Sequence, residues 1–290
     1  MPASRSFVFG LTLFAVAVAW ETTALAAPTI VGHRGASADA PENTLEALEE
    51  AWKQGAGGAE IDVMLTQDKQ LVLMHDDDLE RVTGGENNQR IEDLDYAELK
   101  DIDVGSWKGK KFKDVRVPLL IDVLKALPKG KKLFIEVKSG DLNEGADTKN
   151  MLPALKQTLR ASKVPTDAVC IISFDHDFIN AAKKRMPKYD AYYLTIFTPC
   201  RGKWVEITNE KQLNEVMEKA VANKVDGLNI EFSGKLITKS FVETIHKKGL
   251  KVSVWGYAKD DTIKNAKKMA KAGVDYYMTN TPKKVTAGIK

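Results

Sequence analysis

This chain of 290 residues has few cysteines and a small net charge. The two cysteines are Cys170, expected to open a strand, and Cys200, expected beyond the far end of the next strand. That placement predicts a separation greater than the ~7 Å that a disulfide allows between Cα atoms. The net charge is only +3, and the lysine clusters at residues 108–113 and 129–132 are typical of solvated loops. We therefore expect neither a disulfide nor a nucleic-acid partner.

Long apolar runs are missing from the chain after its first 26 residues. Arg5 supplies a positive start, residues 7–20 are almost wholly apolar, and residues 24–26 (Ala-Leu-Ala) give a small-x-small cleavage pattern. This pattern predicts a secretory signal peptide over residues 1–26, and secretion across the inner membrane into the periplasm. The alternative is an uncleaved membrane anchor, but the apolar run is shorter than the ~20 residues of a spanning helix. We expect no stable membrane anchor after cleavage.

Internal repeats and low-complexity linkers are also missing, which favours one domain over residues 27–290. Apolar, strand-like runs alternate with helix-like stretches, and Asn43 is a candidate N-cap for a helix over residues 43–53. Eight strands separated by helices predict an α/β fold with a parallel sheet covered by helices. The mature length matches the ~250 residues of a TIM (β/α)8 barrel, with a doubly wound open sheet as the alternative. Strands are expected at residues 29–33, 59–64, 133–138, 168–174, 191–196, 227–231, 251–255 and 275–279.

One connection is too long for an ordinary loop between a strand and a helix. A short run at residues 70–75 reads as a hairpin partner of the second strand, and residues 77–118 follow it. This stretch contains Thr83-Gly84-Gly85, three consecutive amide residues and a lysine-rich run. Structureless loops of this length are uncommon unless they are functional. We therefore predict a small insertion after the second strand that lies over the rim and shapes substrate access.

Three carboxylates are expected at the tips of buried strands. Residues i and i+2 of a strand share a face, so Glu60 points with Asp62, and Glu136 points with Lys138. Ionised carboxylates inside a barrel are costly unless they are paired or bind a cation. Salt bridges to Lys138 and Arg34 are one way to pair them. Their convergence at one barrel mouth instead predicts an oxygen-rich site for one divalent cation, Ca²⁺ or Mg²⁺.

Two histidines and an arginine accompany these carboxylates. His33 and His75 both end apolar strands, and Arg34 follows His33 between two glycines. A guanidinium fork matches phosphate oxygens, and a near-neutral imidazole pair can supply the base and the acid of phosphodiester cleavage. A structural salt bridge is the alternative role for Arg34. His176 and His246 fall on or beside expected helices, where we expect exposure to solvent rather than catalysis.

Taken in order, these segments resemble the glycerophosphodiester phosphodiesterase family. The resemblance implies a TIM barrel with a lobe inserted after the second strand. It also implies hydrolysis of glycerophosphodiesters, as small-molecule substrates, to sn-glycerol 3-phosphate and an alcohol. The matching segments cover nearly the whole mature chain: HRG (33–35), PENT (41–44), GAEIDV (58–63), LVLMHD (71–76), VPLL (117–120), FIEVK (134–138) and GLKVSVW (249–255).

The resemblance also implies a role for each matching residue. By this resemblance, the two histidines act as general acid and base, and the three carboxylates bind the metal. The basic side chains bind the phosphate. Glu42 would support the site from its loop. Two aromatic residues at later strand tips would line the glycerol side, unless they only pack the barrel. In these roles the residues are His33 and His75 (catalytic), Glu60, Asp62 and Glu136 (metal), and Arg34, Lys138, Phe174 and Trp255 (substrate).

One position departs from the family pattern. Asn280 stands where the family often has an acidic residue near the last strand tip. We expect this change to affect substrate preference and to leave the metal and acid/base residues untouched. Three other functions remain open: a related barrel phospholipase acting on intact lipids, a periplasmic binding protein without turnover, and a Schiff-base aldolase using Lys138. The headgroup, the preferred ion and the oligomeric state are not fixed by these residues.

Overall fold

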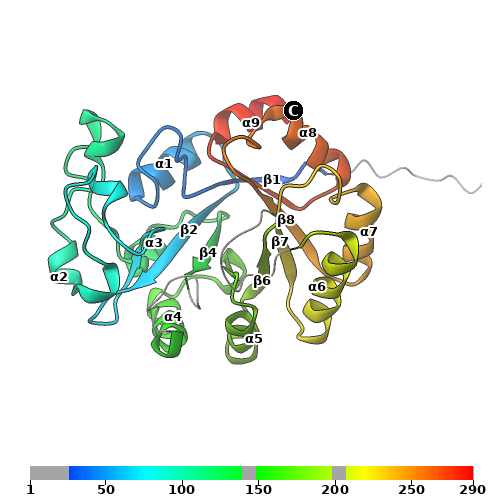
Figure 1. Ribbon diagram of the computed structural model, residues 1–290, viewed down its shortest axis with the longest axis horizontal. Coiled ribbons are helices and arrows are strands. Elements are labelled where there is room, and N and C mark those ends of the chain that lie inside the picture. Colours follow the sequence, from blue (N-terminus) through cyan, green and yellow to red (C-terminus); the bar gives the residue numbers. More distant parts are fainter. Residues whose placement is uncertain (1–25, 139–147, 198–206, 290) are drawn as a thin grey trace, which may run out of the picture.

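Eight short apolar segments form a closed barrel of parallel strands in the computed structural model, which describes residues 26–138, 148–197 and 207–289. The strands follow each other in the order β1-β9-β8-β7-β6-β5-β4-β2, and β2 pairs back onto β1 to close the ring (Figure 1). This confirms the predicted TIM barrel. The strands are β1 (Thr29–Gly32), β2 (Gly58–Leu65), β4 (Lys132–Val137), β5 (Val169–Ser173), β6 (Asp190–Thr195), β7 (Gly227–Glu231), β8 (Lys251–Trp255) and β9 (Tyr276–Thr279).

Alternation along each strand separates the two faces of the barrel wall. In β2, Ala59, Ile61 and Val63 belong to the large core between the strands and the helices. Glu60 and Asp62 therefore face the barrel axis. Below the carboxylates, inward-facing side chains form a separate apolar cluster that closes the barrel interior. This cluster consists of Val31, Phe134, Cys170, Ile172, Tyr192, Tyr276 and Met278.

Helices cover the outside of the barrel (Figure 1). No helix of the described residues is long and apolar enough to cross a membrane. Side-chain caps set several helix starts, because a Thr or Asn oxygen accepts a hydrogen bond from a first-turn N–H. The outer helices are α1 (Leu45–Lys53), α3 (Leu120–Ala126), α4 (Thr148–Ser162), α5 (His176–Arg185), α6 (Glu210–Ala222), α7 (Lys239–Lys247), α8 (Ile263–Ala272) and α9 (Pro282–Ile289).

The first helix corrects one prediction. Thr44, not Asn43, is the N-cap of α1, and its hydroxyl accepts from the backbone N–H of Ala47. Asn43 has a φ of 58°, in the left-handed region, and its side chain turns away from the helix. Asparagine tolerates this backbone conformation better than most residues. The Asn prediction was wrong because the capping pattern does not distinguish two adjacent polar residues.

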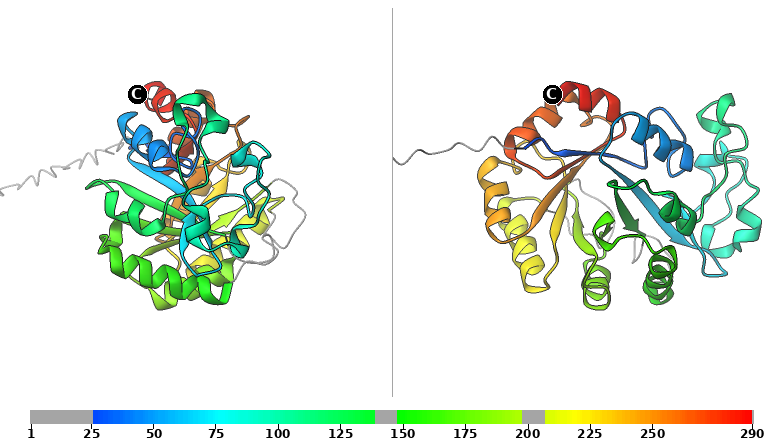
Figure 2. Two further views of the ribbon diagram at one scale, coloured as in Figure 1. Left: turned by 90° about the vertical axis from the view of Figure 1, so that its left-hand side faces the viewer. Right: turned by 180° about the vertical axis from the view of Figure 1, so that it is seen from behind.

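The insertion (residues 77–118) forms a compact lobe beside the barrel wall (Figure 2). It is preceded by β3 (Leu71–Leu73), which pairs antiparallel with β2. It contains α2 (Tyr96–Leu99) and four 3₁₀ helices: 81–83, 91–93, 106–108 and 110–112. Its side chains form their own core with those of the hairpin. That core consists of Met64, Val72, Met74, Leu79, Val82, Ile91, Leu94, Leu99, Val104, Val115 and Val117.

His176 corrects a second prediction, because it is only 4% exposed. Its Nε2 donates to the backbone oxygen of Leu194 at 3.0 Å, and its ring stacks on Tyr193. Burial lowers its pKa to about 4, so the ring is neutral at pH 7. The side chain of His246 is 37% exposed and pairs with Asp275, as its predicted place on the surface requires.

We predicted that the two cysteines form no disulfide, but only one of them lies within the described residues. Cys170 is buried in the barrel interior, where burial raises the pKa of its thiol. Cys200 lies outside the described residues. The absence of a disulfide between them therefore stays a prediction.

Candidate metal centre and active site

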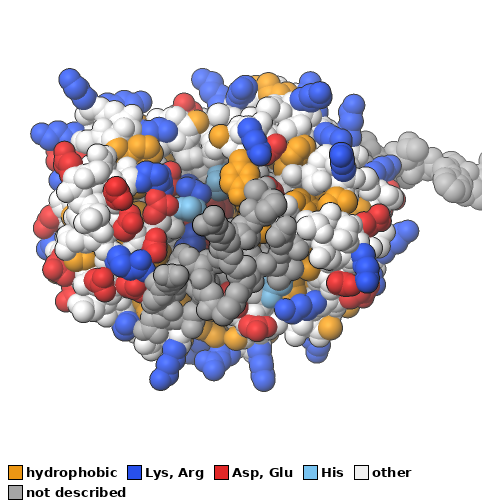
Figure 3. All heavy atoms as spheres, in the orientation of Figure 1, with side chains coloured by type: hydrophobic (Ala, Val, Ile, Leu, Met, Phe, Trp, Pro, Cys, Tyr) orange, Lys and Arg blue, Asp and Glu red, His pale blue; other side chains and the backbone are white. Residues whose placement is uncertain are grey.

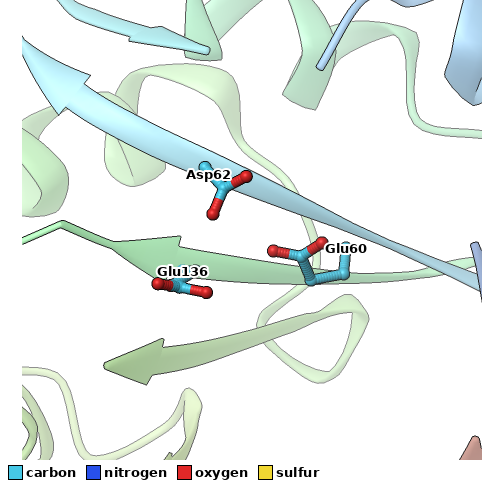
Figure 4. Close-up of side chains that lie close together, drawn as sticks. All are labelled: Glu60, Asp62 and Glu136. Carbon is cyan, nitrogen blue, oxygen red and sulfur yellow. The ribbon is translucent and has the colours of Figure 1, made fainter. Parts of the chain in front are cut away.

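Three carboxylates converge at the carboxyl end of two neighbouring strands. Glu60 and Asp62 come from β2, and Glu136 comes from β4, directly opposite Asp62 in the strand register. One oxygen from each lies within 4.8 Å of the others, and the carboxylates point toward one another (Figure 4). All three are buried. The predicted pairing of faces along β2 and β4 is therefore present in the structure.

The electrostatics of this cluster favour a cation. Burial, followed by the charges of Asp62 and Glu136, raises the pKa of Glu60 well above its ordinary value. Its Oε1 is buried and has no hydrogen-bond partner among the described residues. An ionised, unpartnered carboxylate oxygen beside two other carboxylates is costly without a positive charge. Three buried carboxylates are also the donor type that hard divalent cations prefer, so these residues fit such an ion.

Lys138 and Arg34 compensate part of this negative charge. Lys138 Nζ lies 2.8 Å from Asp62 Oδ1 and also contacts Glu136. Burial acts to lower the pKa of Lys138, but the two carboxylates outweigh it and raise the pKa, so the ammonium stays charged. In the same way, Asp62 has a lowered pKa because Lys138, His75 and Arg34 outweigh the effect of its burial. The salt bridges considered as an alternative are thus present, and they leave Glu60 Oε1 unpaired.

Arg34 reaches the cluster through both its backbone and its side chain. Its backbone N–H donates to Glu60 Oε2 at 2.8 Å, from a left-handed conformation with φ of 55°. Its Nη1 donates to Glu42 Oε1 at 2.8 Å. Its Nε lies 3.3 Å from Asp62 Oδ2, an ion-pair distance, but without the geometry of a hydrogen bond. This buried N–H is therefore available to an oxygen of a bound anion.

The two histidines have different environments. Nδ1 of His33 donates to Asn280 Oδ1 at 2.8 Å, which leaves Nε2 3.9 Å from Glu60 Oε2. Burial, and then the charge of Arg34, lowers the pKa of His33 to about 4. Nδ1 of His75 donates to Asp76 Oδ1 at 2.6 Å, so Nε2 is the ring nitrogen that can accept a proton.

Asn280 corrects the expectation that this position would not affect the acid/base residues. Its Oδ1 accepts from both His33 Nδ1 and the Ser37 hydroxyl, at 2.8 and 3.0 Å. An acidic residue here would give His33 a charged partner, whereas the amide orients the ring without a charge. The departure from the family pattern therefore bears directly on one of the predicted catalytic residues.

Both histidines line one cavity of about 560 Å³ at the barrel mouth. On the face drawn in Figure 3, histidine and basic side chains gather near the centre, beside hydrophobic ones. Phe174 and Trp255 form an edge-to-face pair on one wall, with ring centroids 5.9 Å apart. Trp107, from the insertion, is another lining residue. The insertion thus contributes to the cavity, as predicted.

All nine predicted site residues lie at this end of the barrel. The sequence interpretation gave no site role to Asn43, Asp76 or Trp107. Asn43 lies in the PENT segment and Asp76 directly follows His75, so their positions in the motifs were available signals. Trp107 carried no signal, because nothing in the sequence shows how the insertion folds back over the rim.

Fold and site together define a (β/α)8-barrel protein with a buried acidic centre, and with basic side chains and two histidines at its mouth. The chain belongs to the glycerophosphoryl diester phosphodiesterase family, whose model matches residues 33–284. The predicted resemblance is therefore confirmed, and with it the prediction that the chain is a member of a phosphodiesterase enzyme family.

Individual relatives agree with this assignment. The glycerophosphodiester phosphodiesterase of Caldanaerobacter subterraneus subsp. tengcongensis is 30% identical over 256 residues, covering 87% of this chain and 94% of the relative. The structure of an Oleispira antarctica phosphodiesterase in complex with the product sn-glycerol-3-phosphate has a TM-score of 0.73 and 27% identity, over 91% of this chain and 97% of that one. A glycerophosphodiester phosphodiesterase from Agrobacterium tumefaciens has a TM-score of 0.70 at 23% identity, covering 90% and 99%, which supports the fold.

Proposed function

We propose that this protein hydrolyses glycerophosphodiesters to sn-glycerol 3-phosphate and an alcohol. The observation that carries the proposal is the meeting of three buried carboxylates, two basic side chains and two imidazoles at one cavity. The Oleispira antarctica relative supports the product, because its structure is a complex with sn-glycerol-3-phosphate. The cavity volume of about 560 Å³ is in the range of sites that bind small molecules.

We propose further that Glu60, Asp62 and Glu136 hold one divalent cation, Ca²⁺ or Mg²⁺. Their mutual oxygen distances, their burial and the unpartnered Glu60 Oε1 support this ligand set. A cation bound there would supply Lewis-acid charge neutralisation at a phosphoryl oxygen.

The side chains of the chain itself would perform the remaining steps. Arg34 and Lys138 bind the phosphate oxygens, since both are half-buried cations at the edge of the acidic cluster. One of His33 and His75 takes a proton from the nucleophile, which is water or a glycerol hydroxyl. The other gives a proton to the departing alkoxide, and each transfer is worth about 10²–10⁴-fold in rate. Phe174 and Trp255, paired on one wall of the cavity, would pack against the glycerol carbons.

The proposal is tested by assaying the purified protein with glycerophosphocholine, with and without EDTA, and with added Ca²⁺ or Mg²⁺. We expect release of glycerol 3-phosphate that stops with EDTA and returns with one of the ions. Release that ignores the chelator would contradict the metal proposal. A lack of release across several headgroups, with either ion, would contradict the function itself.

We propose that the mature protein is secreted into the periplasm. The support is the pattern of residues 1–26, with its apolar run and its Ala-Leu-Ala end. Mass spectrometry of protein recovered from the periplasm should give Ala27 as the first residue. Recovery of a chain that still begins at Met1 would overturn cleavage.

A further inference from the structure

Arg81, in the insertion, lies between two carboxylates at the cavity mouth. Its Nη2 and Nη1 donate to Glu42 Oε1 and Oε2 at 2.8 and 3.0 Å, and its Nε donates to Asp76 Oδ2 at 2.6 Å. Its guanidinium also stands 5.9 Å from the centre of the Trp107 ring. Arginine can donate hydrogen bonds to two carboxylates at once because its N–H donors lie in one rigid plane.

Each of these carboxylates also holds a residue of the proposed active site. Glu42 Oε1 accepts from Arg34 Nη1 at 2.8 Å, and Asp76 Oδ1 lies 2.6 Å from His75 Nδ1. The hydrogen bonds therefore run without a break from Arg34 through Glu42, Arg81 and Asp76 to His75. The ends of this chain of bonds are a proposed phosphate-binding side chain and a proposed acid/base side chain.

We propose that Arg81 is a positioning residue that fixes His75 through Asp76 and Arg34 through Glu42. This inference rests on the proposed function, because it assigns the two ends of the chain their roles in it. Arg81 keeps Asp76 in the orientation that holds the Nδ1 proton of His75, so that Nε2 faces the substrate as an acceptor. The insertion thereby becomes part of the catalytic geometry and not only a wall of the cavity.

The exposure of Arg81 indicates that this residue positions its neighbours and contributes little to the stability of the fold. Its side chain is 41% exposed, and ion pairs that water can reach contribute little to folding. Burial acts to raise the pKa of Asp76, but hydrogen bonds from His75 and Arg81 outweigh it, so the carboxylate is ionised. We therefore expect the loss of Arg81 to disturb the orientation of Asp76 and His75 far more than the stability of the fold.

Arg90 offers a matched control in the same lobe. It also bridges two carboxylates, with Nη1 3.0 Å from Asp77 and Nη2 2.9 Å from Glu92, and its side chain is 36% exposed. These carboxylates are not part of the chain of bonds that ends at His75. Arg90→Met thus removes a comparable ion-pair network without touching the proposed pathway.

The test is a double-mutant cycle on the full-length mature protein with glycerophosphocholine. Arg81→Met and Asp76→Asn should each lower kcat at least about ten-fold. The double variant should be no worse than the poorer single variant, because both changes break the same path. Arg90→Met should keep kcat and KM, and Arg81→Lys should not rescue, since an ammonium lacks the planar fork. Losses that multiply in the double variant, or an Arg81→Met enzyme as active as the Arg90→Met enzyme, would overturn the proposal.

A second readout does not depend on turnover. Long-range ¹H–¹⁵N spectra should show the His75 ring protonated at Nδ1 in the parent protein and in Arg90→Met. They should show a mixture of tautomers in Arg81→Met. An unchanged His75 signal in Arg81→Met would overturn the positioning role even if the parent protein hydrolysed no glycerophosphodiester. Failure of the proposed function would instead appear as an inactive parent protein.

Discussion

The amide of Asn43 stands just before the first helix but serves the neighbouring strand. Its Nδ2 donates to Asp62 Oδ2 at 2.8 Å, and its Oδ1 accepts from the backbone N–H of Asp62 at 3.0 Å. These two bonds hold both ends of one proposed metal ligand, and Asn43 is itself only 3% exposed. Partners of this kind orient the ligand before the ion arrives. The sequence predicted that Asn43 caps the first helix. It did not predict that the side chain bonds to Asp62 instead.

Asn43→Gly separates the side chain from the backbone. Glycine adopts the left-handed conformation without steric strain, so the side-chain amide is lost while the backbone path is kept. We expect the affinity for Ca²⁺ or Mg²⁺, measured by titration calorimetry, to fall about 10–100-fold. Asn209→Gly, which removes the side-chain cap of α6, should leave this affinity unchanged. Equal affinities for Asn43→Gly and the parent protein would remove Asn43 from the metal site.

The second prediction at the residue scale concerns the two histidines that line the cavity. His33→Ala and His75→Ala should fold normally and lose at least about 100-fold in kcat, because each proton transfer is worth that much. His246→Ala serves as the control, since His246 pairs with Asp275 away from the cavity. Normal turnover in either of the first two variants would exclude that histidine from the mechanism.

At the scale of elements, the bounds of the strands were predicted within a residue or two. The contacts that the helices make with the barrel were not predicted. Alternating apolar residues on β2 and its neighbours are required by burial under the outer helices, so the sequence carries that signal directly. The burial of His176 depends instead on α5 packing against β6, a contact between segments that no local pattern reports. The carboxylate cluster was predictable because strand tips of a parallel barrel meet at one rim.

The buried His176 predicts how stability depends on pH. Its pKa is about 4 in the folded protein and about 6.5 when unfolded, so the unfolded state binds more protons between these values. Stability should therefore fall as the pH drops from 6.5 toward 4, by up to about 3 kcal/mol from this residue. His176→Gln keeps a donor for the Leu194 oxygen and should flatten this part of the profile, as measured by denaturant unfolding at several pH values. Parallel profiles for the two proteins would contradict the assignment.

At the scale of the whole molecule, the barrel and the insertion have separate cores but one active site. The core of the insertion is built around Leu99 and its neighbours, while the main core lies between the strands and the outer helices. Arg81 and Trp107 nevertheless reach the cavity from the insertion. The sequence predicted that the insertion lies over the rim, but not its contacts, because these depend on how its short helices pack.

A matched pair of core variants tests this division. Leu99 in the insertion is 0% exposed and Leu159 in α4 is 1% exposed, so Leu→Ala at either site should cost about 2–5 kcal/mol. Leu99→Ala should increase hydrogen exchange mainly within residues 77–118 and should reduce activity. Leu159→Ala should lower the unfolding temperature and keep activity well below it. Uniform exchange across the chain in Leu99→Ala would show that the two cores unfold as one.

The closure of the barrel has a consequence for synthesis. β1 lies between β2 and β9, and Thr29 is in register with Tyr276. A growing chain on the ribosome thus carries β1 with one edge unpaired until residues 276–279 have emerged. The barrel therefore cannot close before residue 279 has emerged, so a factor that must handle the open chain can act from the synthesis of β1 until that of β9.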